Sequence, residues 1–290
     1  MMLKGICLVR PRYFSYNKFK FIMPRANRHF LPGYIWHITH RCHGKEFLLN
    51  DKVDREHWLS LLHKAKKRFE ITVLGYAVTC NHIHLLIEDT GILNSIPKSM
   101  QLVQGQLAQS FNRRTGRINA FWGDRYFATA IESGIHLIRC LAYIDLNMVR
   151  AGVVTHPSQW RECGYNEIQN GRVRDGIINQ HRLAALLDCK DLEDLKRVHN
   201  QIITETLHRD MLKRDERWTG SIAIGSRKFT ERFAAELGDR LKSRAVIQIE
   251  KEDVFAVREE SGAWFYSTNC EEKSIALRGD NEYEIKFEYL

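Results

Sequence analysis

The sequence predicts an α+β fold with a mainly antiparallel sheet, and three observations about residues 34–152 support this. Short β-rich runs alternate with longer stretches whose apolar residues recur every three or four positions, as in amphipathic helices. Two of the β-rich runs are separated by only three residues, which indicates a hairpin and therefore antiparallel pairing. Helical stretches separate the other runs. The expected order is βαββαβα, a ferredoxin-like split βαβ arrangement with one helix added.

The first strand is predicted over Tyr34 to Cys42, where the β-rich sequence alternates in hydrophobicity. The first helix follows from Asp54 to Phe69, because its large apolar residues fall on one helical face. Ile71 to Val78 and His82 to Glu88 are the next two strands, and Thr79-Cys80-Asn81 is the tight link between them. These boundaries place two strands of opposite direction side by side.

A second long helix, a fourth strand and a final helix complete this half of the chain. Apolar residues recur at helical spacing at Ile96, Met100, Val103, Leu107 and Phe111. Arg125 to Ile131 is β-rich and is expected to be the fourth strand. The final helix is predicted from Ser133 to Gly152, with a serine N-cap and a terminal glycine. Its buried stripe is expected at Leu137, Ile138, Leu141, Ile144 and Met148.

Two histidines one residue apart, His82 and His84, lie in the apolar run of the third strand. Alternate side chains share a face of a strand, so both imidazoles project together while Ile83 and Leu85 point into the core. Two imidazoles on one face can bind one divalent metal ion. The sulfur of Cys80 raises zinc as an alternative, but a single sulfur in the turn favours Mg²⁺ or Mn²⁺ with imidazole and oxygen ligands.

The final helix carries an unusual polar face. Arg139, Tyr143, Asn147 and Arg150 follow one another at spacings of four, four and three, which places them on one side. Guanidinium charge favours a phenolate and holds phosphate oxygens, while the amide oxygen of Asn147 could complete a coordination sphere begun by two imidazoles. The pattern therefore indicates a phosphate-binding face, although an isolated helical tyrosine more often serves packing.

Three motifs occur in order: His82-Ile83-His84, then Phe121-Trp122-Gly123-Asp124-Arg125-Tyr126-Phe127, then Tyr143-Ile144-Asp145-Leu146-Asn147-Met148-Val149-Arg150-Ala151-Gly152. In these motifs the chain resembles the single-tyrosine HUH transposases of the insertion-sequence 200 type. Within that group it is most similar to the REP-associated tyrosine transposases. The resemblance covers roughly Pro24 to Tyr165, about half of the chain. Three motifs in order are far more specific than any one of them.

The resemblance implies a DNA transposase, a metal-dependent enzyme that cuts and rejoins single-stranded DNA near hairpins. Tyr143 would be the nucleophile that forms a 5′-phosphotyrosine bond, and His82, His84 and Asn147 would bind Mg²⁺ or Mn²⁺. Tyr126 competes as nucleophile, but its aromatic surroundings favour burial. Two other interpretations stay open. The chain could be a non-catalytic nucleic-acid-binding protein that retains the fold, or a metal phosphodiesterase that uses water while Tyr143 positions the substrate.

Charge is distributed unevenly over the 290 residues, whose net charge is +9. Residues 1–22 hold 5 basic and 0 acidic side chains, residues 23–165 hold 18 and 11, and residues 166–290 hold 21 and 24. The basic excess therefore lies in the half that carries the motifs. This placement favours a polyanionic partner for that half, although a merely basic soluble protein would show the same total.

Five arginines are candidates for contact with DNA phosphates. Arg139 and Arg150 belong to the polar face of the final helix, and Arg113, Arg114 and Arg117 belong to an expected loop over Asn112 to Arg117. Basic side chains near a phosphate-binding face supply non-specific affinity for DNA. A solvated turn explains the loop arginines equally well.

We expect three parts along the chain. Residues 1–22 form a disordered basic extension, and Met23 is the expected natural start of the protein. Residues 23–169 form the HUH single-tyrosine transposase domain, to which we expect the chemistry to be confined. Residues 170–290 form an accessory region without a chemical motif. Its elements are expected to be helical and then β-like, with helices over Asp191 to Arg214 and within Gly225 to Arg244 and β-like sequence from Val246 to Leu290.

The remaining features concern the cellular setting. The seven cysteines form no CxxC pair and are odd in number, so a disulfide framework is not expected. No apolar run approaches the roughly 20 residues of a membrane span, and no secretory signal is recognisable. We therefore expect a cytoplasmic protein without membrane contact. The sequence leaves monomer and homodimer both open, as well as the identity of the DNA hairpin.

Overall fold

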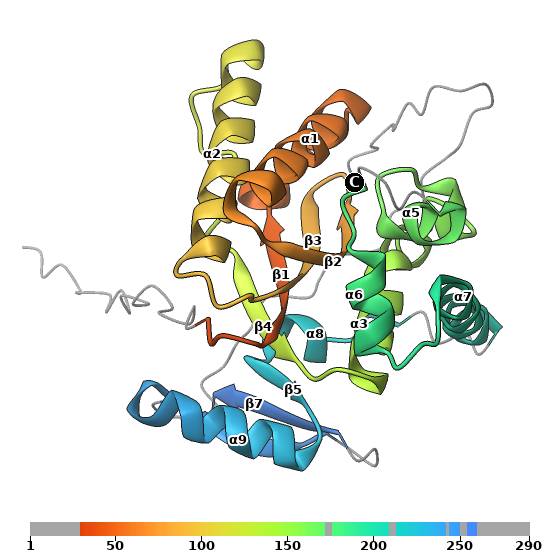
Figure 1. The fold of residues 1–290 in the computed structure, drawn as a ribbon. Helices are drawn as coiled ribbons and strands as arrows, with labels where there is room; N and C mark the ends of the chain where they lie inside the picture. Colours follow the sequence, from red (N-terminus) through yellow and green to blue (C-terminus); the bar gives the residue numbers. More distant parts are fainter. Residues whose placement is uncertain (1–29, 172–175, 209–212, 242–243, 250–253, 260–290) are drawn as a thin grey trace, which may run out of the picture.

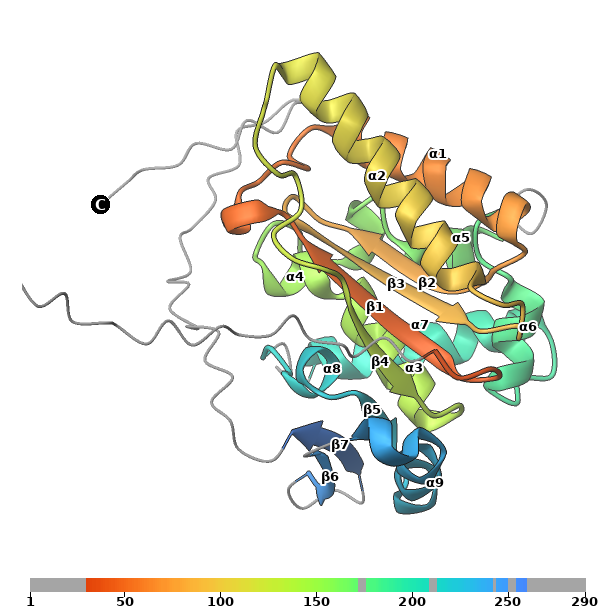
Figure 2. The same ribbon diagram turned by 90° about the vertical axis from the view of Figure 1, so that its left-hand side faces the viewer.

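The computed structural model describes residues 30–171, 176–208, 213–241, 244–249 and 254–259. The predicted extension over residues 1–22 and the predicted start at Met23 lie outside the described residues. So do residues 260–290 of the predicted β-like segment. The α+β fold is confirmed, because one sheet is covered by helices on both faces (Figures 1 and 2).

The sheet has seven strands among the described residues, in the order β2-β3-β1-β4-β5-β7-β6. The strands are β1 Ile35–Arg41, β2 Thr72–Val78, β3 His82–Glu88, β4 Phe127–Ile131, β5 Ala223–Gly225, β6 Arg244–Gln248 and β7 Phe255–Glu259. The first four pair antiparallel in the order of a split βαβ arrangement, as the sequence predicts. β5 then adds parallel to β4, and β7 and β6 extend the sheet antiparallel.

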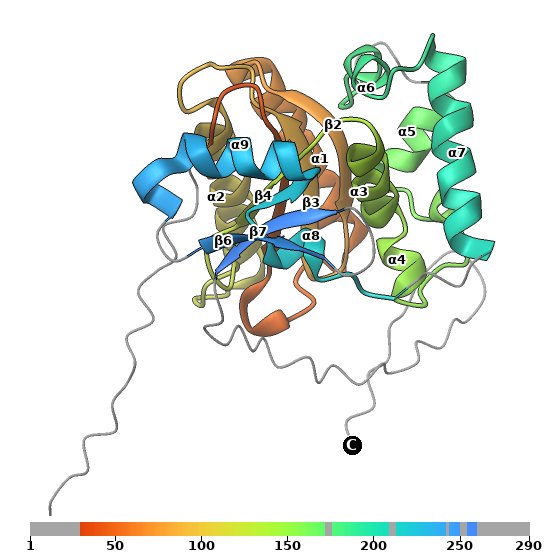
Figure 3. The ribbon, with the colours of Figure 1, turned by 90° about the horizontal axis from the view of Figure 1, so that it is seen from below.

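Two long helices cover one face of the sheet, and the helices between residues 135 and 220 cover the other (Figure 2). The first layer consists of α1 Lys52–Phe69 and α2 Ser95–Thr115. The second layer consists of α3 Ile135–Asp145, α4 Asn147–Arg150, α5 Gly164–Asn170, α6 Gln180–Leu186, α7 Leu192–His208 and α8 Arg217–Gly220. Seen from below, α9 Arg227–Leu237 lies beside β5, β6 and β7, while α5, α6 and α7 gather beside α3 (Figure 3). Short 3₁₀ turns occur at His43–Lys45, Pro157–Gln159 and Gly238–Leu241.

The two faces of β3 differ as its alternation predicts. Ile83, Leu85 and Ile87 are fully buried in the hydrophobic core. His82 and His84 share the opposite face, beneath α3 and α4, because successive strand residues point to opposite sides. His84 is only 2% exposed, so this face is covered by protein and is not a solvent-facing surface.

The final helix differs from the prediction at its start and in the middle. It begins at Ile135 with Gly134 as N-cap, and Ser133 supplies no side-chain cap. It is interrupted at Leu146, whose φ of −80° and ψ of 7° separate α3 from α4. The apolar stripe continues through this interruption, which is why the sequence pattern predicts one continuous helix. Gly152 does end the segment with a φ of +67°, a conformation that glycine adopts without strain.

Gly75 allows α3 to approach the sheet closely. A Cβ atom at this position would lie 2.5 Å from Cδ1 of Leu141, which is shorter than any acceptable contact. The pairing of β2 with β3 also shifts register between Val73 and Gly75. A residue without a side chain therefore sets the distance between the metal-ligand candidates on β3 and the helix that carries the tyrosine.

The second half of the chain continues the sheet of the first. Ala130 and Ile131 pair with Ala223 and Ile224, and the Glu132 carboxylate accepts hydrogen bonds from the Ser226 backbone at 2.5 Å and hydroxyl at 2.9 Å. The boundary after residue 169 stays a prediction. No helix in the described ranges is long and apolar enough to cross a membrane, and the five cysteines described there are free.

Candidate active site

Strand register brings three histidines together beneath α3. β1 pairs with β3 so that Thr39 faces His84 and Arg41 faces His82, and His37 lies on the same face one step along β1. The rings of His37 and His84 stack with centroids 5.1 Å apart, and those of His82 and His84 meet edge to face at 4.9 Å. The sequence predicts the second pair but not the participation of His37.

A chain of hydrogen bonds defines the tautomer of His84. His37 Nδ1 lies 3.0 Å from the Trp218 carbonyl oxygen, which can only accept, so Nδ1 carries the proton. Burial lowers the pKa of His37 to about 4, so the ring is neutral and its Nε2 accepts. His84 Nδ1, 2.9 Å away, is therefore the donor, and the Nε2 lone pair of His84 points toward the final helix.

His82 is held by its own hairpin. Its Nδ1 lies 2.6 Å from Asn81 Oδ1 and 2.8 Å from Thr79 Oγ1, and the Thr79 hydroxyl donates to the His82 carbonyl oxygen. An amide oxygen only accepts, so Nδ1 of His82 carries the proton. Nε2 of His82 has no hydrogen-bond partner among the described residues. Both histidines thus present an Nε2 lone pair, the form in which imidazole binds a metal.

Asn147 stands where a third ligand would be needed. Its Nδ2 donates to Nε2 of His84 at 2.9 Å, so the amide and the imidazole already meet. No group of three or more His, Cys, Asp or Glu side chains that could hold a metal ion occurs in the described part of the chain. A site here would instead use two imidazoles and an amide oxygen. That donor set suits a hard or borderline cation that keeps several waters.

Tyr143 lies against the same histidines. Its ring centroid is 5.9 Å from that of His84 and 6.3 Å from that of His37, both in edge-to-face geometry. Arg150 covers the ring with its guanidinium carbon 4.1 Å from the centroid and donates to the Tyr143 carbonyl at 2.6 Å. The Trp218 ring lies 6.2 Å away. The Tyr143 hydroxyl makes no hydrogen bond within the described part of the chain.

The pKa of Tyr143 is raised, because burial disfavours the phenolate more than nearby arginines favour it. Arg150 and Arg214 act in the lowering direction, as the sequence predicts for guanidinium groups, and Asp215 acts against them. The phenol is therefore protonated at neutral pH in the free protein. A nucleophilic role requires its proton to leave during the reaction.

Arginines surround the two imidazoles. Burial lowers the pKa of His82 well below its ordinary value, and the positive charges of Arg41, Arg150 and Arg214 add to this effect. The His84 imidazole responds in the same way to burial and to its histidine neighbours. Both rings are therefore neutral and able to act as ligands, in surroundings that attract an anion.

The other predicted arginines are placed less centrally. Arg139 is exposed on α3. Arg113 and Arg114 lie in the last turn of α2, so the predicted loop over residues 112–117 is wrong for its first four residues. Arg114 donates to both Asp54 oxygens at 2.6 Å, and Arg117 donates to the Glu46 carboxylate at 2.7 and 2.9 Å. These two guanidinium groups already have carboxylate partners.

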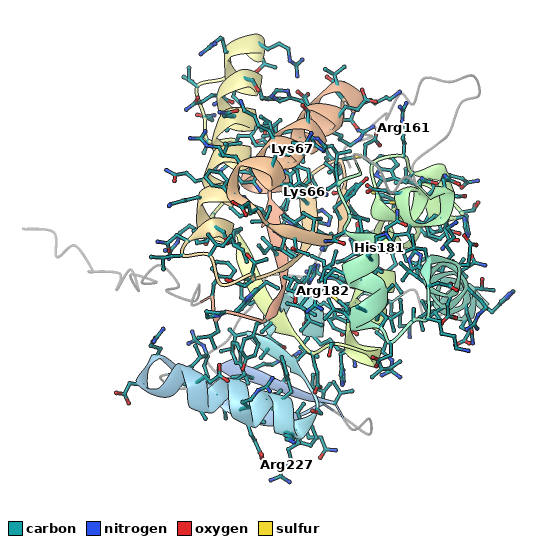
Figure 4. The ribbon with its side chains drawn as sticks, viewed as in Figure 1. Lys66, Lys67, Arg161, His181, Arg182 and Arg227 are labelled. Atoms are coloured by element: carbon teal, nitrogen blue, oxygen red, sulfur yellow. The ribbon has the colours of Figure 1, made fainter. Side chains whose placement is uncertain are left out.

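Another set of basic side chains lies on the face shown in Figure 4, away from the histidines. Lys66 and Lys67 come from α1, and His181 and Arg182 from α6 (Figure 4). Lys66 donates to the Gly176 carbonyl at 2.7 Å, and Arg182 forms an ion pair with Glu88 at 2.6 Å. Glu88 ends β3, whereas His82 begins it, so these cations lie toward the opposite end of the strand.

Tyr126 lies on the other side of the sheet from Tyr143. Its ring packs 6.2 Å from His40 and 6.4 Å from Phe30. His40 is three residues from His37 on β1 and therefore points to the opposite face. The structure brings Tyr143, and not Tyr126, to His82 and His84.

Sequence reasoning missed four contributors to this site, namely His37, Arg41, Arg214 and the Trp218 carbonyl. His37 and Arg41 are separated by an even number of positions on β1 and therefore share one face of the strand. This spacing identifies both residues once β1 is aligned with β3. Arg214 and Trp218 carry no such signal, because only the folded chain brings the segment before β5 to the site.

Part of the chain is similar to known proteins. Residues 32–147 match the family model described as transposase, IS200 like. Over this stretch, about two fifths of the chain, the protein is similar to IS200-like transposases. The matched segment contains His82, His84, Tyr143 and Asn147 and ends at the last of them.

Two solved structures are similar to parts of the chain. One is a REP-associated tyrosine transposase bound to a REP hairpin, with 20% identity and a TM-score of 0.44 over 53% of this chain and 90% of that chain. The other is a protein of Deinococcus radiodurans R1 assigned as a transposase, with 15% identity and a TM-score of 0.29 over 36% of this chain and 83% of that chain. A search of curated proteins found no match.

Proposed function

We propose that the chain cuts and rejoins single-stranded DNA next to hairpins, with Tyr143 as the nucleophile. The observation that carries this proposal is the convergence of Tyr143 and Asn147 on His82 and His84 beneath one helix. The similarity to IS200-like transposases supports a reaction on DNA. A cytoplasmic location, as expected from the sequence, belongs to the same proposal.

The proposed reaction is a transesterification. The Tyr143 oxygen attacks the scissile phosphorus and forms a tyrosine–phosphate bond, while the bond between phosphorus and the 3′ oxygen breaks. The proton lost by the phenol is balanced by the proton that the departing 3′ oxygen gains. One DNA fragment is left with a 3′-hydroxyl, and the other is joined to the protein through its 5′-phosphate. Attack by a 3′-hydroxyl on this bond reverses the step and joins strands.

His82, His84 and Asn147 would hold Mg²⁺ or Mn²⁺, since the two imidazole rings lie 4.9 Å apart and the Asn147 amide contacts Nε2 of His84. A bound cation would supply a Lewis acid for the scissile phosphate. The chain's own contributions are separate from this. Arg150 fixes the Tyr143 ring, and Arg41 and Arg214 supply positive charge where a phosphate would enter.

Covalent trapping tests the proposal. A pool of single-stranded oligonucleotides with hairpins and randomised flanks, incubated with the protein and Mn²⁺, should give a protein–DNA adduct that retains a 3′-end label. A 5′-end label should leave as a free fragment. Tyr143→Phe should abolish the adduct but keep DNA binding, because only the nucleophilic oxygen is lost, and Tyr126→Phe is the matched control.

Each other outcome identifies a different function. Cleavage without an adduct in the wild type would overturn the proposal in favour of a phosphodiesterase that uses water. Binding without cleavage would indicate a nucleic-acid-binding protein that retains the fold. An adduct that survives Tyr143→Phe but not Tyr126→Phe would move the nucleophile to the other face of the sheet.

A further inference from the structure

We propose that His37 is a positioning residue, which holds His84 in the tautomer and orientation that the cation requires. The proposal rests on the proposed function in one respect, namely that His84 is a metal ligand. His37 itself would not contact metal or DNA. It would act through the hydrogen bond of its Nε2 with Nδ1 of His84 at 2.9 Å.

The geometry leaves His37 little freedom. Its side chain is fully buried, and each ring nitrogen has one partner, His84 on one side and the Trp218 carbonyl on the other. The Thr129 hydroxyl lies 3.3 Å from the Trp218 carbonyl oxygen and donates to the closer Ser221 carbonyl oxygen at 2.6 Å. A neutral histidine between an obligate acceptor and His84 allows only one arrangement of protons.

His82, the other candidate ligand, is also held through its Nδ1. Asn81 and Thr79 hold Nδ1 of His82, so both imidazoles present Nε2. The hydrogen bonds that hold His82 come from its own hairpin. Those that hold His84 pass through His37 to Trp218, which is 181 residues from His37 in the sequence. Ligands supported in this way lose about 10-fold to 100-fold in metal affinity when the support is removed.

This assignment gives the second half of the chain a defined part in the site. The segment before β5 contributes no candidate ligand, yet its backbone fixes the ring on which the orientation of His84 depends. Local disturbance of that segment should therefore change metal affinity without removing any candidate ligand.

The test compares three variants of the full chain. His37→Leu removes both hydrogen bonds, whereas His37→Gln keeps an acceptor for His84 Nδ1 and a donor for the Trp218 carbonyl. His40→Leu is the matched control, a buried histidine of the same strand on the opposite face. Two readouts are measured: Mn²⁺ affinity by calorimetry, and the ring ¹⁵N shifts of His84 in the metal-free protein by NMR.

The expected result is a 10-fold to 100-fold weaker Mn²⁺ Kd in His37→Leu, a change within a few fold in His37→Gln, and no change in His40→Leu. The ¹⁵N shifts should show a single Nδ1-protonated His84 in the wild type and a mixture of tautomers in His37→Leu. A single unchanged tautomer and a wild-type Kd in His37→Leu would overturn the proposal. If the wild type bound no Mn²⁺, the proposed function would fail, whereas the NMR result would still decide whether His37 sets the tautomer.

Discussion

His84 and His199 are both buried histidines that contact the helical segment of Tyr143, but their hydrogen bonds differ. His199 on α7 donates from Nε2 to Asp145 at 2.8 Å and accepts at Nδ1 from Gln169 at 3.0 Å, and both partners are fixed inside the protein. His84 donates from Nδ1 to His37 and accepts at Nε2 from the Asn147 amide beside Tyr143, both at 2.9 Å. A histidine bound to a buried carboxylate serves structure, whereas one whose Nε2 lone pair accepts only from a neutral amide can give that lone pair to a cation.

Both histidines also depend on residues from the two halves of the chain. His199 brings α7 to α3, and His84 is supported through His37 by Trp218. Asp145, the partner of His199, lies between Tyr143 and Asn147 in the sequence. It therefore projects from a different side of the helical segment than the residues that contact His84. The same short stretch thus carries a structural contact and the proposed chemistry.

Removal of residues 170–290 should have the largest effect, because it removes His199 and Trp218 together. The sequence leads us to expect that the chemistry is confined to residues 23–169, and all the candidate catalytic and ligand side chains do lie there. The structure adds the Trp218 carbonyl and three strands of the shared sheet. A fragment of residues 23–169 should therefore fail to form the adduct. Circular dichroism and adduct formation on the same fragment check this, and a folded, fully active fragment would contradict it.

Loss of a ligand candidate should abolish cleavage, and His84→Ala should also lower stability because its imidazole is buried and hydrogen-bonded. His82→Ala and His84→Ala should each reduce the cleavage rate by about 100-fold or more, because each removes a metal–nitrogen bond. Asn147→Ala should reduce it less, since water can replace one oxygen ligand. Cleavage rates across a Mn²⁺ titration, with excess chelator as the zero point, measure this. Full cleavage by the wild type in chelator would refute the metal role.

Loss of His199, the structural histidine, should lower stability but leave the cleavage rate nearly unchanged. His199→Ala leaves the Asp145 carboxylate buried without its donor, which should lower the free energy of unfolding by about 3 kcal/mol. Urea denaturation measures the loss, and the cleavage rate per folded molecule should change little. If His199→Ala lost activity while keeping its stability, the distinction between the two histidines would be wrong.

The smallest expected effect concerns Glu167, a buried residue whose hydrogen bonds also join the two halves of the chain. Glu167 accepts from the Ile178 backbone at 2.7 Å and from the Tyr76 hydroxyl at 3.1 Å, and burial raises its pKa. The folded state then holds the proton to higher pH than the unfolded state, so this group's contribution to stability falls as pH rises from about 4.5. Glu167→Gln removes this dependence.

The stability of Glu167→Gln relative to the wild type should therefore improve between pH 4.5 and pH 7. Urea denaturation at the two pH values measures the change. A difference that stays constant with pH would show that the Glu167 carboxylate does not titrate differently in the folded state.

The sequence predicts the first half of the fold because its patterns are local. Alternation in β3 and the polar face of the final helix depend on spacing alone, and both are found at His82, His84, Tyr143 and Asn147. The interruption at Leu146 cannot be seen in the sequence, because the apolar stripe of the helix continues through it. β5 is also missed, because three residues that pair with a distant strand carry no period of their own. The support of His84 by Trp218 depends on tertiary contact between distant segments and is therefore invisible to spacing.

The central claim is that Tyr143 attacks DNA beside the paired histidines. Its most direct test is to form the adduct, trim the DNA with nuclease and identify the modified peptide by mass spectrometry. The expected product is a nucleotide joined through its 5′-phosphate to the oxygen of Tyr143. Modification of Tyr126 or another side chain, or a cut strand with a 5′-phosphate but no modified peptide, would contradict it.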